Sequence, residues 1–338
     1  MSSADAGAAP PPSREVAPGI WSIRQPLSNA MRYVWAYAIE LADGVLLVDA
    51  GYDEDGHEAN LEAGLGLFGA SLDDVQGVIF THFHRDHYGM AGRIRARSGA
   101  WLALHEVEAR LIAAEVGAVE TRRQVERWFE DLGVGAESAA GLSELAVRLE
   151  TQNRSAARPD RVLADGDVLE LGRDRFEIVH TPGHSPGHVC IVERRRGVVF
   201  SGDHVLSWTT PNVSIFAGTQ GSPLGDYLRS LERVRPLRGL LDLPGHEDAV
   251  DIGDRALELL DYHAEQLEAV TALLACGTGT VWELAAALWP EAWAGLAAID
   301  RLLALGEAYA HIAVLVASGR LKLVGRQPFR WQAAAGAP

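Results

Sequence analysis

The sequence predicts a layered α/β fold that is followed by a small helical domain. In the first 258 residues, short apolar runs bounded by turn residues alternate with segments of helical periodicity. The chain has 338 residues, which exceeds the usual size of a single hydrophobic core. Apolar residues make up 48% of the chain, which is enough for a large buried core. We therefore expect one large domain and one smaller domain.

The first part of the chain predicts antiparallel strands joined by tight turns. Three apolar runs, IWSIRQ, VWAYAIEL and VLLVDAG, follow one another, and the turn sequence ADG separates the last two. A further buried strand, VQGVIF, leads directly into a group of histidines. After it, MAGRIRARSGA predicts a helix that ends at a glycine cap, and WLALH predicts the next strand.

Residues 106–150 predict a helical insertion, because Leu, Val, Ala and Phe recur there at helical spacing among many charges. Strand patterns return at RFEIVH, HVCIVE and VVFSGD, and each is followed by a turn or loop that carries a His or Asp. The segment PLGDYLRSLERVRPL predicts a helix, and LLDLPGH predicts a final strand.

The two ends of the chain differ from the part between them. Residues 259–338 predict three helices and a terminal hairpin, SGRLKLVGRQPFRW, an order typical of a winged-helix domain. Residues 1–16 are rich in Ala and Pro without an apolar block, which predicts a disordered leader and not a secretory signal. A cytoplasmic location is the resulting default. The sequence holds no apolar stretch of the roughly 20 residues that a membrane span needs.

Charge and cysteine content restrict the chemistry. The chain has 30 basic and 46 acidic residues, a formal charge of −16 that disfavours polyanionic partners. Its two cysteines, Cys190 and Cys276, are too few for a disulfide framework or a four-thiolate zinc cluster. A metal site would therefore have to use histidines and carboxylates.

The segment THFHRDHYG has the composition of such a site. It places His82, His84, Asp86 and His87 within six residues, directly after a predicted strand. Four donors so close in sequence cannot share one face of a helix or strand, so a loop must wrap them around a common centre. Neutral imidazoles suit zinc, and a mixed set with carboxylate indicates a catalytic site. A chance surface histidine is the alternative for His82 alone, but not for the whole motif.

Further donors recur where predicted strands end. They are His184 and His188 in TPGHSPGH, Asp203 and His204 in FSGDH, and His246 in LPGHED. In this order the motifs resemble those of the metallo-β-lactamase superfamily, over residues 17–258. The resemblance, which is to glyoxalase II-like and lactonase-like members with a C-terminal winged helix, implies a four-layer αββα sandwich. It also implies a metal-dependent hydrolase.

The resemblance assigns seven of these donors to two metal ions that share a carboxylate. The first metal is expected at His82, His84 and His184, and the second at Asp86, His87 and His246, with Asp203 between them. Two Zn²⁺ ions are expected, with iron or manganese as alternatives. A metal-bridging hydroxide would be the nucleophile, and Asp86 could pass a proton to the leaving group.

Two other residues are expected to support the ligands. Asp49, in VLLVDAG, matches a position where the family places a buried carboxylate behind the metal ligands. The alternative for Asp49 is a cap on the turn before Gly51. His188 is expected to orient the loop that carries His184.

The leading hypothesis for the substrate is a small acyl compound, either a thioester such as acyl-CoA or acylglutathione, or a lactone. Candidate pocket residues are Trp208, Asn212 and His204, although His204 could instead form a hydrogen bond nearby. Tyr227 is a candidate donor to the substrate carbonyl, with packing of its helix as the alternative. We expect no nucleic acid and no membrane partner, and a homo-oligomer is compatible with the sequence.

Three other functions remain open from the sequence. They are a metal-dependent phosphodiesterase or ribonuclease, a mononuclear iron persulfide dioxygenase, and a nucleic-acid-binding regulator whose metal site is inert. Residues 259–338 contain five basic and seven acidic side chains, whereas a DNA-binding domain should be basic on one face. We therefore expect this domain and the insertion to wall the substrate pocket. β-Lactamase activity is disfavoured by the expected cytoplasmic location.

Overall fold

The computed structural model describes residues 10–28, 31–114, 118–152, 157–275, 277 and 279–334. The chain forms two compact units. The first unit comprises Met1–Ala114, Asn153–Pro211 and Glu232–Ala256, and the second comprises Glu115–Gln152, Asn212–Leu231 and Leu257–Pro338. Within the described residues, no helix combines the length and the apolar character that crossing a membrane requires.

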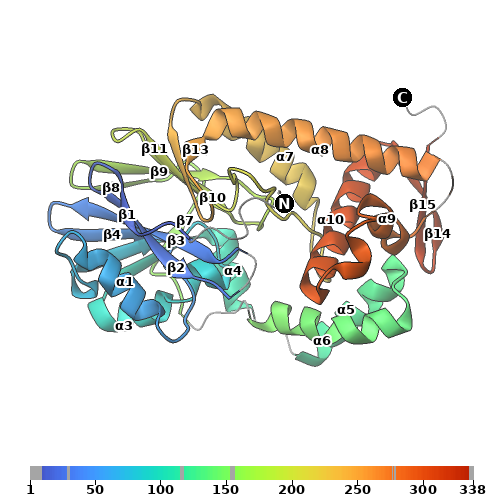
Figure 1. The fold of residues 1–338 in the computed structure, drawn as a ribbon, viewed down its shortest axis with the longest axis horizontal. Coiled ribbons are helices and arrows are strands. Elements are labelled where there is room, and N and C mark those ends of the chain that lie inside the picture. The colour runs from blue at the N-terminus through green and yellow to red at the C-terminus, as the bar shows by residue number, and fades with distance from the viewer. Residues whose placement is uncertain are drawn as a thin grey trace. The chain divides into compact units, whose positions relative to one another are not determined.

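A seven-stranded sheet forms one half of the first unit, with its strands in chain order. Several of its strands, among them β1 to β4, are labelled in Figure 1. β1 to β4 pair antiparallel through short turns, whereas β4 to β7 pair parallel across helical connections. The strands are β1 (Arg14–Ala17), β2 (Ile20–Pro26), β3 (Tyr33–Leu41), β4 (Gly44–Val48), β5 (Val75–Ile79), β6 (Trp101–His105) and β7 (Arg161–Leu163).

A six-stranded sheet forms the other half of this unit, in the order β13-β12-β11-β10-β9-β8. β11 and β12 pair parallel, and the other neighbours pair antiparallel. The strands are β8 (Val168–Leu171), β9 (Asp174–His180), β10 (Val189–Glu193), β11 (Val198–Gly202), β12 (Leu241–Pro244) and β13 (Val250–Asp251).

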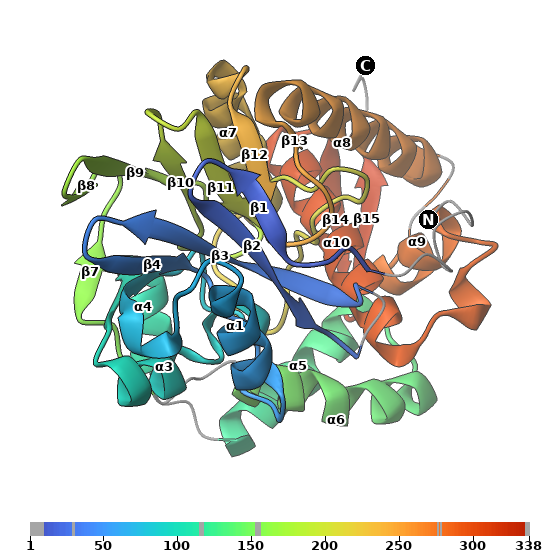
Figure 2. The ribbon, with the colours of Figure 1, turned by 60° about the vertical axis from the view of Figure 1, so that its left-hand side comes forward.

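The two sheets pack face to face because their strands bury apolar side chains between them. Tyr37 and Ile39 of β3 share a buried cluster with Ile191 of β10 and Phe200 of β11. On the outer face of the seven-stranded sheet, a second buried cluster packs against helices. Figure 2 shows these helices beside the sheet. The helices of the first unit are α1 (His57–Gly66), α2 (Arg85–Tyr88), α3 (Ala91–Ser98) and α4 (Glu106–Ala113), with short 3-10 turns at Leu72–Asp74 and Arg235–Leu237.

Two helices, α7 (Pro223–Val234) and α8 (Ile252–Ala275), run from one unit into the other. Their residues in the first unit adjoin the six-stranded sheet in sequence, since α8 follows β13 directly. The first unit is therefore a sandwich of two sheets with helices on the outer face of the seven-stranded sheet, in agreement with the α/β sandwich that the sequence predicts.

The second unit is mainly helical and has its own core. Val125 and Phe129 of the insertion share one buried cluster with Leu284, Leu305 and other residues of the C-terminal segment. A capping box at Thr280 and Glu283 starts the helix α9. Its other elements are α5 (Ala118–Leu132), α6 (Ala136–Gln152), α9 (Val281–Leu288), a 3-10 turn (Trp293–Gly295), α10 (Ala298–Ala317), β14 (Leu321–Arg326) and β15 (Phe329–Ala333).

Several sequence predictions differ in detail from the structure. Residues 14–16 of the predicted leader form part of β1, where they pair with β2, while residues 1–9 lie outside the described residues. The predicted insertion is three helices, of which only α4 belongs to the first unit. Three helices and a hairpin occupy the C-terminal segment in the predicted order, and their assignment as a winged helix stays a prediction.

Candidate metal centre

The seven predicted donors lie on four connections that leave the strands of the two sheets. Residues 82–87 follow β5 and enter α2, and His184 lies between β9 and β10. Asp203 follows β11, and His246 follows β12. The structure brings them together in three overlapping groups whose ligand atoms lie within 4.8 Å of one another: His82, His84 and His184; His82, His87 and Asp203; and Asp86, His87 and His246.

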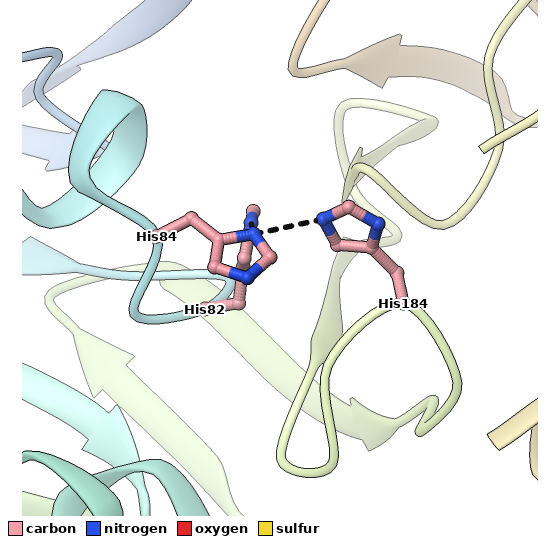
Figure 3. A group of neighbouring side chains, drawn as sticks. All are labelled: His82, His84 and His184. Atoms are coloured by element: carbon pink, nitrogen blue, oxygen red, sulfur yellow. Dashed lines mark hydrogen bonds between the residues drawn. The ribbon is translucent and has the colours of Figure 1, made fainter. Parts of the chain in front are cut away.

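The first group, which we call the three-histidine cluster, consists of His82, His84 and His184. The distance from His84 Nδ1 to His82 Nε2 is 3.0 Å, and that to His184 Nε2 is 2.9 Å (Figure 3). Burial lowers the pKa of His82 well below its usual value, and burial together with His184 lowers the pKa of His84 to about 3. Neutral imidazoles that point their nitrogens at one another are suited to share a cation.

The other donors mix imidazole with carboxylate. His246 Nε2 lies 3.5 Å from Asp86 Oδ2 and 3.6 Å from Asp203 Oδ1, and His87 Nε2 lies 3.4 Å from the same Asp203 oxygen. Burial opposes protonation of His246, but Asp203 and Asp86 outweigh it and raise the pKa of His246 to about 10. Within the described residues, His87 Nε2 and Asp203 Oδ1 are buried without a hydrogen-bond partner. Such atoms fit a bound divalent cation, which would satisfy both.

Asp49 lies behind these donors, as the sequence predicts. Its Oδ1 accepts a hydrogen bond from Thr81 N at 2.8 Å, and its Oδ2 accepts from Thr81 Oγ1 at 2.8 Å and from His87 Nδ1 at 2.8 Å. Because the Thr81 hydroxyl donates to Asp49, His82 Nδ1 donates in turn to Thr81 Oγ1, at 3.0 Å. Asp49 therefore holds the Nδ1 atoms on the side away from the cluster, so that the Nε2 atoms of both His82 and His87 face it. Its backbone has a positive φ of 57°, which costs conformational energy.

His188 orients the loop around Asp203. Its Nδ1 lies 2.9 Å from Thr181 Oγ1, and its Nε2 accepts a hydrogen bond from Asp203 N at 3.2 Å. These contacts fix the neutral tautomer with the proton on Nδ1, and burial lowers the pKa of His188 well below its usual value. His188 thereby fixes the position of the Asp203 backbone.

Two glycines allow the strand-end connections to approach closely. A Cβ at Gly245 would lie 2.6 Å from Asp203 Oδ1 and 2.6 Å from His87 Cε1. A Cβ at Gly202 would lie 2.6 Å from Thr81 Oγ1, and Gly202 has a φ of +51°. Larger residues at either position would displace the donors.

Two buried glutamates near the cluster were missed from the sequence. Glu108 of α4 accepts hydrogen bonds from Phe83 N, Ser185 Oγ and Gly187 N. Burial raises the pKa of Glu108 to about 7, although these hydrogen bonds act to lower it. Glu247, which follows His246, accepts from Trp208 N at 2.8 Å and from Thr209 Oγ1. Glu108 stands in no ligand motif, and Glu247, although it follows His246 in LPGHED, carries no sequence signal that its side chain holds a neighbouring loop.

The structure separates the predicted pocket residues by exposure. The Trp208 side chain is exposed, with 54% of its surface accessible, whereas His204 and Tyr227 are completely buried. The Tyr227 ring packs edge-on against His263, with centroids 5.5 Å apart, and Asn212 Oδ1 accepts from Ser214 Oγ. A completely buried side chain does not contact a substrate, so burial favours the packing alternative for Tyr227 and argues against a pocket role for His204.

Comparisons with known proteins agree with this arrangement. The family model of the metallo-beta-lactamase superfamily matches residues 30–246. Human acyl-coenzyme A thioesterase MBLAC2 is 27% identical over 246 residues, covering 63% of this chain and 81% of that protein. Hydroxyacylglutathione hydrolase GloC from Haemophilus influenzae is 28% identical over 186 residues, covering 53% of this chain and 72% of that protein.

A solved structure extends the likeness over nearly the whole chain. It is that of a metallo-beta-lactamase family protein from Thermus thermophilus, with 31% identity and a TM-score of 0.78, covering 95% of this chain and 100% of that one. The chain therefore belongs to the metallo-beta-lactamase superfamily and is a metal-dependent hydrolase with its characteristic fold.

Proposed function

We propose that the protein is a zinc-dependent hydrolase of small acyl thioesters. The observation that carries the proposal is the convergence of seven His and Asp donors from four separate connections on one small volume. Five of these seven donors are imidazoles, which suit zinc, and no thiolate takes part. We further propose two metal ions, because the donors divide into two sets of three around Asp203.

The proposed ligands of the first ion are His82, His84 and His184. Those of the second are Asp86, His87 and His246, and Asp203 would contact both. Bound zinc would supply a water of lowered pKa as nucleophile and would polarise the acyl carbonyl. The ligand sets leave room for water and substrate, since each ion has four protein donors at most.

The side chains around the proposed metal ions fix where protons lie and how the ligands are oriented. Asp49 and Thr81 keep the protons of His87 and His82 on Nδ1, away from the reacting groups. The Asp86 side chain is 19% exposed and lies 3.9 Å from His87 Nε2 and 3.5 Å from His246 Nε2. Despite burial, these histidines lower the pKa of Asp86, so its carboxylate is ionised at neutral pH, as a metal ligand must be. Its partial exposure would also let it pass a proton to a departing thiolate.

The choice of a thioester rests on relatives and charge. Two relatives are named for hydrolysis of an acyl-CoA and of a hydroxyacylglutathione, both of which are thioesters. The formal charge of −16 disfavours a nucleic acid as substrate. The exposed indole of Trp208, on the loop held by Glu247, offers an apolar surface to an acyl group.

The test follows thiol release from acyl-CoA and acylglutathione with a chromogenic thiol reagent, using zinc-loaded protein. We expect turnover that Asp86→Ala lowers by about 100-fold or more, because it removes both a ligand and a proton carrier. The matched control is Asp73→Ala, whose carboxylate is 62% exposed and pairs only with Arg97 at 2.7 Å among the described contacts. It should retain full turnover. Absence of turnover on every thioester would reject the proposal and direct attention to lactone, phosphodiester or persulfide substrates.

A further inference from the structure

Glu108 forms a buried polar contact between two separate chain segments. Its side chain belongs to α4 and is completely inaccessible to solvent. Oε2 accepts from Phe83 N at 3.0 Å, while Oε1 accepts from Ser185 Oγ at 2.7 Å and from Gly187 N at 2.6 Å. A buried carboxylate is costly unless donors surround it, and here all three partners are donors.

The three donors flank the three-histidine cluster in sequence. Phe83 lies between His82 and His84, and Ser185 follows His184 directly. One carboxylate oxygen thus holds the segment after β5, and the other holds the segment between β9 and β10. The nitrogens of His84 and His184 approach to 2.9 Å across the same two segments. None of the three donors is adjacent to Asp86, His87, Asp203 or His246.

The fit around Glu108 is tight. A Cβ at Gly187 would lie 2.6 Å from Glu108 Cγ and 2.8 Å from Glu108 N. A glutamine at position 108 would have the same size. Its NH₂ group, however, would replace one of the two accepting oxygens and would then face an N–H or O–H donor. The exchange therefore weakens the link between the two segments without opening a cavity.

We propose that Glu108 is a positioning residue for the first metal site, because it fixes the separation of the segments that carry His82, His84 and His184. The inference rests on the proposed metal centre, but not on the identity of the substrate. It predicts that Glu108 controls the zinc affinity of the three-histidine cluster and leaves that of the other donors unchanged.

The test isolates each site in the full-length protein. In a His246→Ala background, the three-histidine cluster keeps its complete donor set, and Zn²⁺ affinity is measured by competition with a chromogenic chelator. We expect Glu108→Gln to weaken that affinity by about 10- to 100-fold, the usual effect of losing a partner behind the ligands. In a His84→Ala background, the same substitution should change the remaining affinity by less than about twofold.

Co²⁺ substitution gives a second readout, because Glu108→Gln should alter the visible spectrum in the His246→Ala background only. If Glu108→Gln does not fold, as judged by thermal unfolding of the metal-free protein, Ser185→Ala removes a single donor and should weaken zinc binding by about fivefold. Unchanged affinity in the His246→Ala background overturns the proposal, as does an equal loss in both backgrounds. Zinc binding that follows this pattern without thioester turnover would keep the inference and reject only the proposed function.

Discussion

At the residue scale, the centre depends on side chains that fix where a proton lies. Asp49 and Thr81 hold the protons of His87 and His82, and the carbonyl of Tyr33 accepts from His246 Nδ1 at 2.8 Å. In each case this hydrogen bond holds Nδ1, so Nε2 is the ring nitrogen that faces the cluster. The structure thus prepares three imidazoles for a cation through hydrogen bonds on their far side.

Replacing Asp49 by Asn should weaken metal binding at both proposed sites. Three donors face this side chain, and an amide oxygen cannot accept from all of them while its NH₂ group faces another donor. We expect total zinc affinity to fall by about 10- to 100-fold, with a parallel loss of thioester turnover. Chelator competition measures the affinity, and Asp73→Asn, at an exposed carboxylate, serves as the control. Wild-type affinity in Asp49→Asn would show that the carboxylate does not orient the ligands.

The sequence predicted the seven donors but not the residues that link their segments. His82, His84, Asp86 and His87 stand close together, so their spacing alone indicates a shared centre. Glu108 is separated from Phe83 by 25 residues and from Gly187 by 79, and a single Glu in a charged helical pattern carries no signal. Links of this kind depend on tertiary contacts that no local motif records.

At the scale of elements, the connections that leave strand ends carry the chemistry. One of them, residues 207–209, is held by the side chain of Glu247, which accepts from Trp208 N and from two side-chain hydroxyls. Glu247 has a positive φ of 68° and follows His246, so one short segment joins a proposed ligand to the exposed Trp208. The sequence predicted this segment as part of the pocket, but not what holds it.

Loosening this connection should affect substrate binding more than the chemical step. Glu247→Gln puts an amide N–H against a backbone or hydroxyl donor, and losing one hydrogen bond costs about 1 kcal/mol, or roughly fivefold in affinity. We expect KM for long-chain acyl thioesters to rise by about that factor with kcat little changed, and KM for acetyl thioesters to stay constant. Trp208→Ala should reproduce the effect if the indole contacts the acyl chain. A fall in kcat with unchanged KM would place Glu247 in the metal centre instead.

Elements with strong periodicity were predicted, and short or irregular ones were not. The strands IWSIRQ, VLLVDAG and VVFSGD and the helix that ends at Gly99 are present, with Gly99 at a φ of 74°. The helix α1 (His57–Gly66) was missed because its apolar residues are spread around the helix and do not form one stripe. Strands β7 and β8 were missed because each has at most four residues and its side chains are largely exposed, so neither has the apolar alternation of a strand.

At the scale of the whole molecule, the second unit combines parts of the chain that are far apart in sequence. Its core joins Phe129 of the insertion to Leu305 and Trp331 near the end of the chain. The predicted boundary at residue 259 did not include residues 115–152 or 212–231, which belong to the same unit. Periodicity identifies helices, but it does not say which helices share a core.

This unit also buries two histidines that face each other. His311 Nδ1 donates to the carbonyl of Glu307 at 2.9 Å, and its Nε2 lies 3.3 Å from His263 Nδ1. His263 is 1% exposed, and its Nε2 has no hydrogen-bond partner within the described residues. A proton added there would find no acceptor, and burial together with His311 lowers the pKa of His263 from 6.5 to about 3.

The stability of the protein should therefore carry an acid-sensitive contribution from His263. Between pH 3 and 6.5, His263 is protonated in the unfolded chain but neutral in the folded chain. The stability of the folded state is therefore unaffected by this residue above pH 6.5 and decreases as the pH falls below it. From pH 7 to pH 5 the loss amounts to about 2 kcal/mol. Glu307 acts in the opposite direction, because burial raises its pKa to about 7 and acidification then favours the folded state.

The two contributions are separated by differences between variants, measured by urea unfolding of the metal-free protein with tryptophan fluorescence. The stability of the wild type relative to His263→Leu should fall by about 2 kcal/mol between pH 7 and pH 5. The stability of the wild type relative to Glu307→Gln should rise over the same interval. A constant difference between wild type and His263→Leu would mean that His263 is protonated in the folded state, and that the second unit opens or hydrates around this pair. The two differences should be of similar size and opposite sign, because the two groups titrate over the same interval in opposite directions.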